Sequence, residues 1–68
     1  MDRMTSIIVT RLKRLVREGR LTQREVEIIR RRCLETPPET LAAIAHSYGV
    51  SRERVRQIEQ KALSKLLI

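Results

Sequence analysis

A chain of 68 residues can form one small domain with a modest apolar core, and is too short for a large one. It contains no Trp or Phe and a single Tyr, so Leu, Ile, Val and Ala must supply the core, and rows of aromatic rings that stack on single-stranded nucleic acid are not expected. Fifteen Lys and Arg against eight Asp and Glu leave a net charge of +7, which favours a polyanionic partner: nucleic acid first, an anionic membrane second.

The first predicted element is an amphipathic helix that begins at about Thr5 or Ser6 and ends at Glu18. Its apolar face should carry Ile7, Ile8, Leu12, Leu15 and Val16. Gly19 follows at the position where helices often end in a left-handed residue. A packing helix is favoured over a helix lying on a membrane, because the apolar face has no Trp or Phe anchor. No apolar run approaches transmembrane length, and the stretch near the N-terminus is too short for a signal peptide.

A capping box begins the second predicted helix, which is expected to run to about Leu34. Thr22 can accept a hydrogen bond from the backbone of Glu25, whose carboxylate can reach back to the Thr22 N–H. The inner face should carry Val26, Ile29 and Cys33. The cysteine is the only one in the chain, which excludes an internal disulfide, fits a reducing cytoplasm and suits a small core residue better than a reactive thiol.

A proline-containing linker separates this helix from a third. Pro37 and Pro38 forbid a continuous helix between Glu35 and Thr40. The third helix is expected to begin after Thr40, with Thr36 as an alternative cap, and to end at Tyr48 and Gly49. Its core face should be Leu41, Ile44, Ala45 and Tyr48, and its small residues permit close approach of another helix.

The fourth predicted helix follows a tight turn at Gly49 and Val50, with Ser51 as its N-cap. Its inner face should carry Val55, Ile58, Ala62, Leu63 and Leu66. Its outer face should carry Arg52, Glu53, Arg56, Gln57 and Lys61. A helix, a short glycine-containing turn and a second helix form the helix-turn-helix pattern. Arg and Gln read base edges through paired hydrogen bonds, and Glu can accept one from cytosine, so this outer face predicts readout in the major groove of DNA. A helical hairpin with ion pairs on its surface is the alternative.

The reactive side chains argue against an enzyme, and no cofactor or metal is expected. His46 is the only histidine and has no second ligand at metal spacing, and the chain has no glycine-rich phosphate loop. Glu53 and Glu59 lie six residues apart, so they do not form a catalytic carboxylate pair.

Three stretches of sequence carry a resemblance to a known family. They are L-T-Q-R-E from Leu21, T-L-A-A-I-A from Thr40, and Y-G-V-S-R-E-R-V-R-Q-I-E-Q-K-A-L from Tyr48. Together they closely resemble region 4 of the major class of bacterial RNA polymerase sigma factors; the first twenty residues match only loosely. No stretch alternates with period two, so an all-α fold is expected, and the resemblance agrees with it: a single small four-helix domain over residues 1–68, ending in a helix-turn-helix. Residues 1–35 would face the flap of the polymerase β subunit, and residues 39–68 would form the helix-turn-helix.

The resemblance also implies a function and a set of contacts. The domain would recognise the −35 promoter element in duplex DNA as part of transcription initiation with RNA polymerase. Base edges would be read by Arg52, Glu53, Arg56 and Gln57. Phosphates would be contacted by Arg24, Arg32 and Lys61, with Arg54 as a further backbone contact. Expected partners are promoter DNA, the polymerase core through its flap, and an anti-sigma factor; no membrane partner is expected. The expected location is the cytoplasm, with the nucleoid.

Two other functions stay open. The chain could be a protein-interaction module that binds the flap or an anti-sigma factor and touches DNA weakly. It could also be a different free-standing helix-turn-helix regulator; quorum-sensing-type response regulators share a Leu-Thr-x-Arg-Glu segment but lack the R-E-R-V-R-Q-I-E string. The parts of a sigma factor that read the −10 element and bind the polymerase core are absent, so this chain alone should not initiate transcription.

Overall fold

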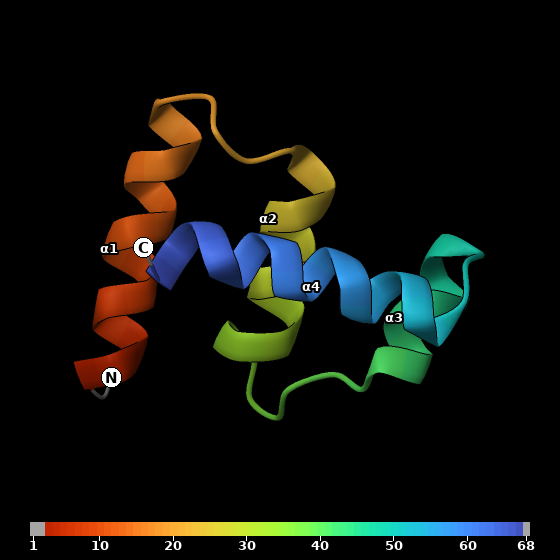
Figure 1. Cartoon of the computed structure of the whole chain (residues 1–68). Helices are drawn as coiled ribbons and strands as arrows, with labels where there is room; N and C mark the ends of the chain where they lie inside the picture. The colour runs from red at the N-terminus through yellow and green to blue at the C-terminus, as the bar shows by residue number, and fades with distance from the viewer. Residues whose placement is uncertain (1–2, 68) are drawn as a thin grey trace.

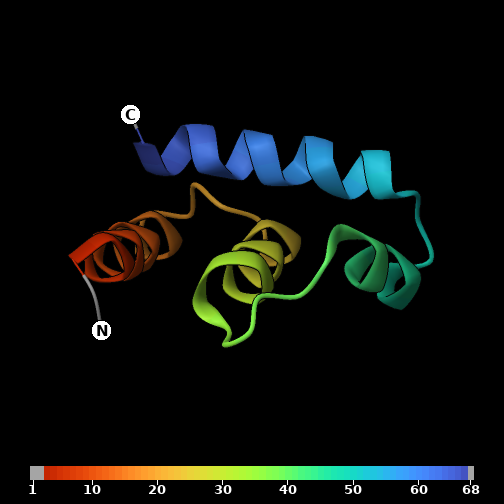
Figure 2. The same cartoon turned by 90° about the horizontal axis from the view of Figure 1, so that it is seen from below.

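The computed structural model describes residues 3–67, and helices are the only regular secondary structure over that range. Met1, Asp2 and Ile68, which belong to the predicted domain, lie outside the described residues. The elements are α1 (Arg3–Arg17), α2 (Gln23–Ile29), the π-helix η1 (Arg30–Leu34), α3 (Leu41–Tyr48) and α4 (Arg52–Leu67). The predicted all-α fold with a terminal helix-turn-helix is confirmed. The long α4 runs across the other helices, from α3 at its N-terminal end, past α2, to α1 near its C-terminal end (Figures 1 and 2).

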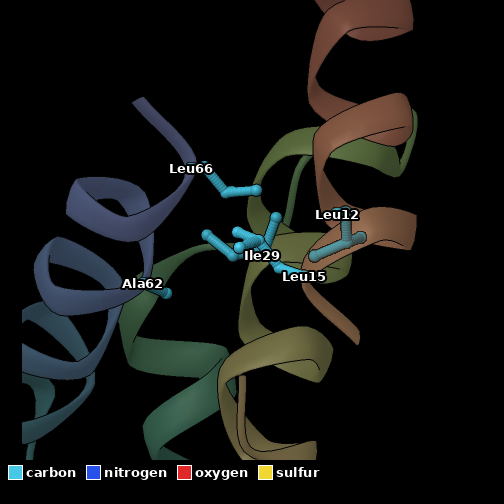
Figure 3. Close-up of a cluster of buried hydrophobic side chains, with 5 residues drawn as sticks. All are labelled: Leu12, Leu15, Ile29, Ala62 and Leu66. Carbon is cyan, nitrogen blue, oxygen red and sulfur yellow. The ribbon is translucent and has the colours of Figure 1, made fainter. Parts of the chain in front are cut away.

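Two apolar clusters lie along α4, and α2 contributes to both. The first cluster joins α1, α2 and the C-terminal half of α4 through Leu12, Leu15, Ile29, Ala62 and Leu66 (Figure 3). The second joins α2, α3 and the N-terminal half of α4 through Ile28, Ile44, Ala45 and Val55. Because α2 lies between the two clusters, two adjacent residues, Ile28 and Ile29, are fully buried, one in each cluster. A helix that packed through one face only would bury a single row of side chains. Sequence patterning missed Ile28, whereas Val26 and Cys33 are only partly buried.

The predicted helix ends agree closely with the observed ones. Gly19 and Gly49 are left-handed, with φ of 71° and 68°. After each glycine the next N–H reaches back five residues to close the helix, from Arg20 to Leu15 O at 2.9 Å and from Val50 to Ala45 O at 3.0 Å. The capping box of α2 is formed, Thr40 caps α3, and Ser51 Oγ accepts from the Arg54 N–H at 3.1 Å. These caps fix where the two helices of the helix-turn-helix begin.

The first half of the chain differs from expectation in the apolar face of α1 and in the type of one helix, whereas the expected helix end at Leu34 is observed. In α1, which begins at Arg3, Ile7 and Val16 are exposed, and only Leu12 and Leu15 are buried, because α1 packs on the rest of the domain through one narrow face. The second helix does not stay α-helical to Leu34: it widens into η1, where the Glu35 N–H reaches Arg30 O at 3.1 Å. The linker that follows contains a cis Thr36–Pro37 peptide bond.

Candidate nucleic-acid interface

The first turns of α4 expose the predicted base-reading side chains. Arg52, Glu53 and Gln57 are exposed, and Arg56 is partly exposed. Three of them, Arg52, Glu53 and Arg56, line one surface recess together with Leu41 of α3. Val55, in the same turns, is fully buried in the cluster that α4 shares with α2 and α3. The helix is therefore held from within while its polar face points outward.

Glu53 and Arg56 form an ion pair one helical turn apart. The Glu53 carboxylate accepts from Nε of Arg56 at 2.9 Å and also from its NH2 group. The hydrogen bond from Arg56 lowers the pKa of Glu53, and the same contact raises the pKa of Arg56. Both groups are thus charged near neutral pH. The pair restrains two long side chains in the first turns of the helix, where a ligand could meet them.

A second groove lies between α2 and α4 and collects most of the predicted phosphate contacts. The start of α2 lines it with Thr22, Arg24 and the Lys65-paired Glu25, and α4 lines it with Arg54, Gln57, Ile58 and Lys61. The Arg24 guanidinium lies over the Tyr48 ring, 4.5 Å from its centre, which restrains this long side chain. Three cations from two helices therefore line this groove, and Gln57 lies among them.

Arg32 is placed differently from the other predicted phosphate contacts. Its Nε donates to Glu59 Oε2 of α4 at 2.6 Å, and its NH1 donates to the Glu39 carbonyl at 3.1 Å. The Glu59 side chain is only 13% exposed. Two of the Arg32 guanidinium nitrogens therefore connect η1 to α4 and to the residue before the α3 cap. These two hydrogen bonds leave the other N–H groups of the guanidinium for a further contact.

The sequence pattern did not indicate the long-range contacts that hold the C-terminal half of α4 against the first half of the chain. The Lys65 ammonium donates to both carboxylate oxygens of Glu25 and to the Arg20 carbonyl. Arg11 donates to the Leu66 carbonyl at 2.8 Å and closes the end of α4. Glu25 was visible as a capping residue, but nothing in a linear pattern indicates a partner 40 residues away. These contacts place α4 on α1 and α2.

The other candidates for chemistry among residues 3–67 are a metal-holding cluster and the Cys33 thiol. No group of three or more His, Cys, Asp or Glu side chains in that range could hold a metal ion. Burial raises the pKa of the Cys33 thiol, which agrees with its interpretation as a packing residue. No helix in the described part of the chain is both long and apolar enough to cross a membrane.

The matches with known proteins all indicate the same family. Residues 19–66 match the family described as sigma-70, region 4. The RNA polymerase sigma factor RpoH of Caulobacter vibrioides is 56% identical over 46 residues, which cover 68% of this chain and 16% of that protein. RpoH of Zymomonas mobilis is 51% identical over 47 residues, covering 69% and 16%. The chain thus spans about a sixth of the curated relatives it matches. No solved structure matches.

Proposed function

The chain belongs to the sigma-70 region 4 family, and from that premise we propose that it recognises the −35 promoter element in duplex DNA, in the cytoplasm, with RNA polymerase. One observation carries the proposal. Arg52, Glu53 and Arg56 share a recess at the exposed start of α4, and three cations line the groove between α4 and the start of α2. This family is not a class of enzymes, and the expected activity is binding.

Base reading is assigned to the first two turns of α4. Arg52 and Arg56 offer guanidinium forks of the kind that bind O6 and N7 of guanine. Glu53 can accept from the exocyclic amine of cytosine while its other contacts hold Arg56 in place. Gln57 suits the paired contact to adenine. The helix-turn-helix geometry brings the N-terminal residues of such a helix to the base edges of the major groove.

Phosphate anchoring is assigned to the groove between α2 and α4. Arg24, Arg54 and Lys61 line it and are exposed. Two of them come from the reading helix and one from α2, so a strand of DNA backbone seated there would fix α4 relative to the base pairs. Contacts of this kind are independent of sequence and weaken as salt displaces them.

The test is a titration of the free domain with two duplexes of equal length. One contains a −35 element and the other a scrambled version, and each is titrated at about 50 and 200 mM salt. We expect tighter binding to the −35 duplex at both concentrations and a loss of affinity for both duplexes as salt rises. Equal affinity for the two duplexes at both concentrations would contradict base reading by this domain.

A second candidate function is supported by α1. Met4, Ile7 and Val16 are 61%, 39% and 48% exposed, and Met4 and Ile7 lie one turn apart on the same side of α1. Ile7 lies in a recess rimmed by Arg3, Arg11 and Arg14. Such a surface suits a protein partner, for which the polymerase flap is the first choice and an anti-sigma factor the second.

Retention of a purified β-flap fragment tests this surface. Ile7→Asp should abolish retention, and Lys13→Asp, on the exposed side of the same helix, should leave most of it. DNA binding should be unchanged in the first variant. If the isolated domain bound the flap and showed no preference between duplexes, the interaction module would be the better description, with DNA reading dependent on tethering to polymerase.

A further inference from the structure

Glu39 is held at each of its polar groups by two consecutive arginines. Its carboxylate accepts two hydrogen bonds from Arg31, from Nε at 2.6 Å and from NH2 at 2.7 Å. Its backbone N–H donates to the Arg31 carbonyl at 2.9 Å. Its own carbonyl accepts from NH1 of Arg32 at 3.1 Å. Glu39, a residue of the proline-containing linker, therefore has its carboxylate and both backbone polar groups hydrogen-bonded to η1.

The π-helical turn directs three adjacent arginines to different partners. Arg30 pairs with Glu27 and Glu35 on the outer surface of the turn. Arg31 turns to Glu39 and reaches Ser47 Oγ at 3.3 Å. Arg32 reaches Glu59 of α4. The Arg31 side chain is only 14% exposed, against 46% for Arg30. Arg31 is thus an internal connector, whereas its neighbour is a surface cation.

Glu39 lies directly before the helix that supports the reading turns. Thr40 is the next residue and the N-cap of α3, where its Oγ1 accepts from the Ala43 N–H at 3.0 Å. Ile44 and Ala45 of α3 then pack on Val55 of α4. Arg31 contacts α3 at both ends, through Glu39 before its first turn and Ser47 in its last. Moving this contact would move α3 and, with it, the support of the reading turns.

We propose that Arg31 and Glu39 form a positioning pair that sets the orientation of α3 on α2 and, through α3, the placement of Arg52, Glu53 and Arg56 against DNA. The link to DNA rests on the proposed function; the orientation of α3 does not. The pair touches no base or phosphate in this scheme. It acts by holding the helix against which the reading helix packs.

A positioning role differs measurably from simple stabilisation. A pair that only stabilised the fold would lower the folded fraction, and the apparent affinities for all duplexes would fall by one common factor. A pair that orients the readers would instead affect contacts to base edges, which depend on angle and distance, more than contacts to phosphates. The ratio of the two affinities and the slope against salt therefore separate the two roles.

Two variants and two matched controls test the pair. Arg31→Gln and Glu39→Gln each remove one side of it. Arg30→Gln and Glu35→Gln remove the same charges from the neighbouring surface pair. In that pair Arg30, the first residue of η1, contacts Glu35, which directly follows the end of η1. Each protein is titrated with the −35 and scrambled duplexes, and residual dipolar couplings report the orientation of α3 relative to α2.

We expect Arg31→Gln and Glu39→Gln to reduce the preference for the −35 duplex roughly three- to tenfold, with a salt slope equal to that of the matched control. The controls should keep the full preference, and the exchange Arg31→Glu with Glu39→Arg should restore part of it. The couplings should show that α3 has turned in both test variants. An unchanged α3 orientation, or a common fall for both duplexes, would overturn the proposal. If the unaltered domain shows no preference, the proposed function fails, and the α3 orientation alone then decides the positioning role.

Discussion

The ammonium of Lys65 lies 3.0 and 3.1 Å from the two carboxylate oxygens of Glu25, so the last turns of α4 are fastened to the first turn of α2. The Glu25 side chain is only 5% exposed, and its other contact is the Thr22 N–H at 2.8 Å. A buried carboxylate is stable only when such partners replace the water it has lost. The helix α4 is therefore anchored electrostatically at the end opposite to the turns proposed to read bases.

Replacing Lys65 with methionine should destabilise the domain by about 1–3 kcal/mol, because Glu25 keeps its buried position and loses its cation. Lys61→Met is the matched control, since Lys61 is exposed on the same helix. That control should stay within about 0.5 kcal/mol of the unaltered domain. Urea unfolding followed by circular dichroism measures both. Equal effects for the two variants would show that the contact to Glu25 contributes nothing.

Acid should destabilise the domain in part through Glu25. Burial by itself would raise the pKa of this carboxyl, but the Thr22 N–H and the Lys65 ammonium more than offset it, so the pKa lies below the ordinary value of 4.5. A group with a lowered folded pKa stabilises the fold above its unfolded pKa and loses that contribution as pH falls through the folded value. Urea midpoints should therefore drop below pH 4.5, and Glu25→Gln should make the drop shallower. Parallel profiles for the two proteins would rule out this contribution.

Readers and anchors should respond differently to substitution. Arg56→Ala should weaken binding to the −35 duplex by about 1–3 kcal/mol and relax the preference at one base pair. Lys61→Ala should weaken all duplexes alike and reduce the salt slope by about 1. Titrations with a set of single-base variants of the duplex measure both effects. If both substitutions acted equally on specific and scrambled DNA, the two roles would be wrongly assigned.

Local signals in the sequence predicted the helix-turn-helix well. Each of its boundaries depends on residues within one turn of it, at Thr40, Gly49 and Ser51, and the amphipathic pattern of α4 has the observed inner face. The exposure of the reading side chains followed from the same pattern, because a face opposite to a buried stripe must point outward.

Features set by distant contacts could not be predicted in this way. Ile28 is buried because α2 lies between two clusters, which a single-stripe pattern does not express. The widening of α2 into η1 places Arg31 and Arg32 against residues of α3 and α4, and no rule of local spacing indicates it. The pairing of Glu25 with Lys65 joins positions that only the folded chain brings together.

Gly49→Ala should destabilise the domain through backbone strain alone. The residue has φ of +68°, which costs an L-residue about 1–2 kcal/mol, and an added Cβ would meet no atom within 4 Å. Gly19→Ala, at φ +71° with the same open surroundings, should cost a similar amount. Because Gly49 sits in the turn of the helix-turn-helix, only its variant should also weaken the preference for the −35 duplex. Thermal unfolding and duplex titration of both variants provide the comparison.

Substitution of Arg32 should lower the stability of the fold, whereas substitution of Arg24 should change mainly the salt dependence of DNA binding. Arg32→Ala removes the partner of Glu59, whose side chain is 13% exposed, and should destabilise the fold by about 1–3 kcal/mol. Arg24→Ala removes an exposed cation and should leave stability nearly unchanged while lowering the salt slope by about 0.9. Urea unfolding and duplex titrations at two salt concentrations measure the two quantities for each variant.

Glu59→Gln then decides whether Arg32 also contacts DNA. This change releases the Arg32 Nε from its ion pair and removes a carboxylate of α4 itself. If Arg32 binds phosphate, Glu59→Gln should strengthen binding to both duplexes, and adding Arg32→Ala should cancel the gain and lower the salt slope by about 0.9. If Arg32 acts only inside the fold, the gain should survive in the double variant, since it would come from the lost negative charge alone. Titrations of the single and double variants at two salt concentrations distinguish these results.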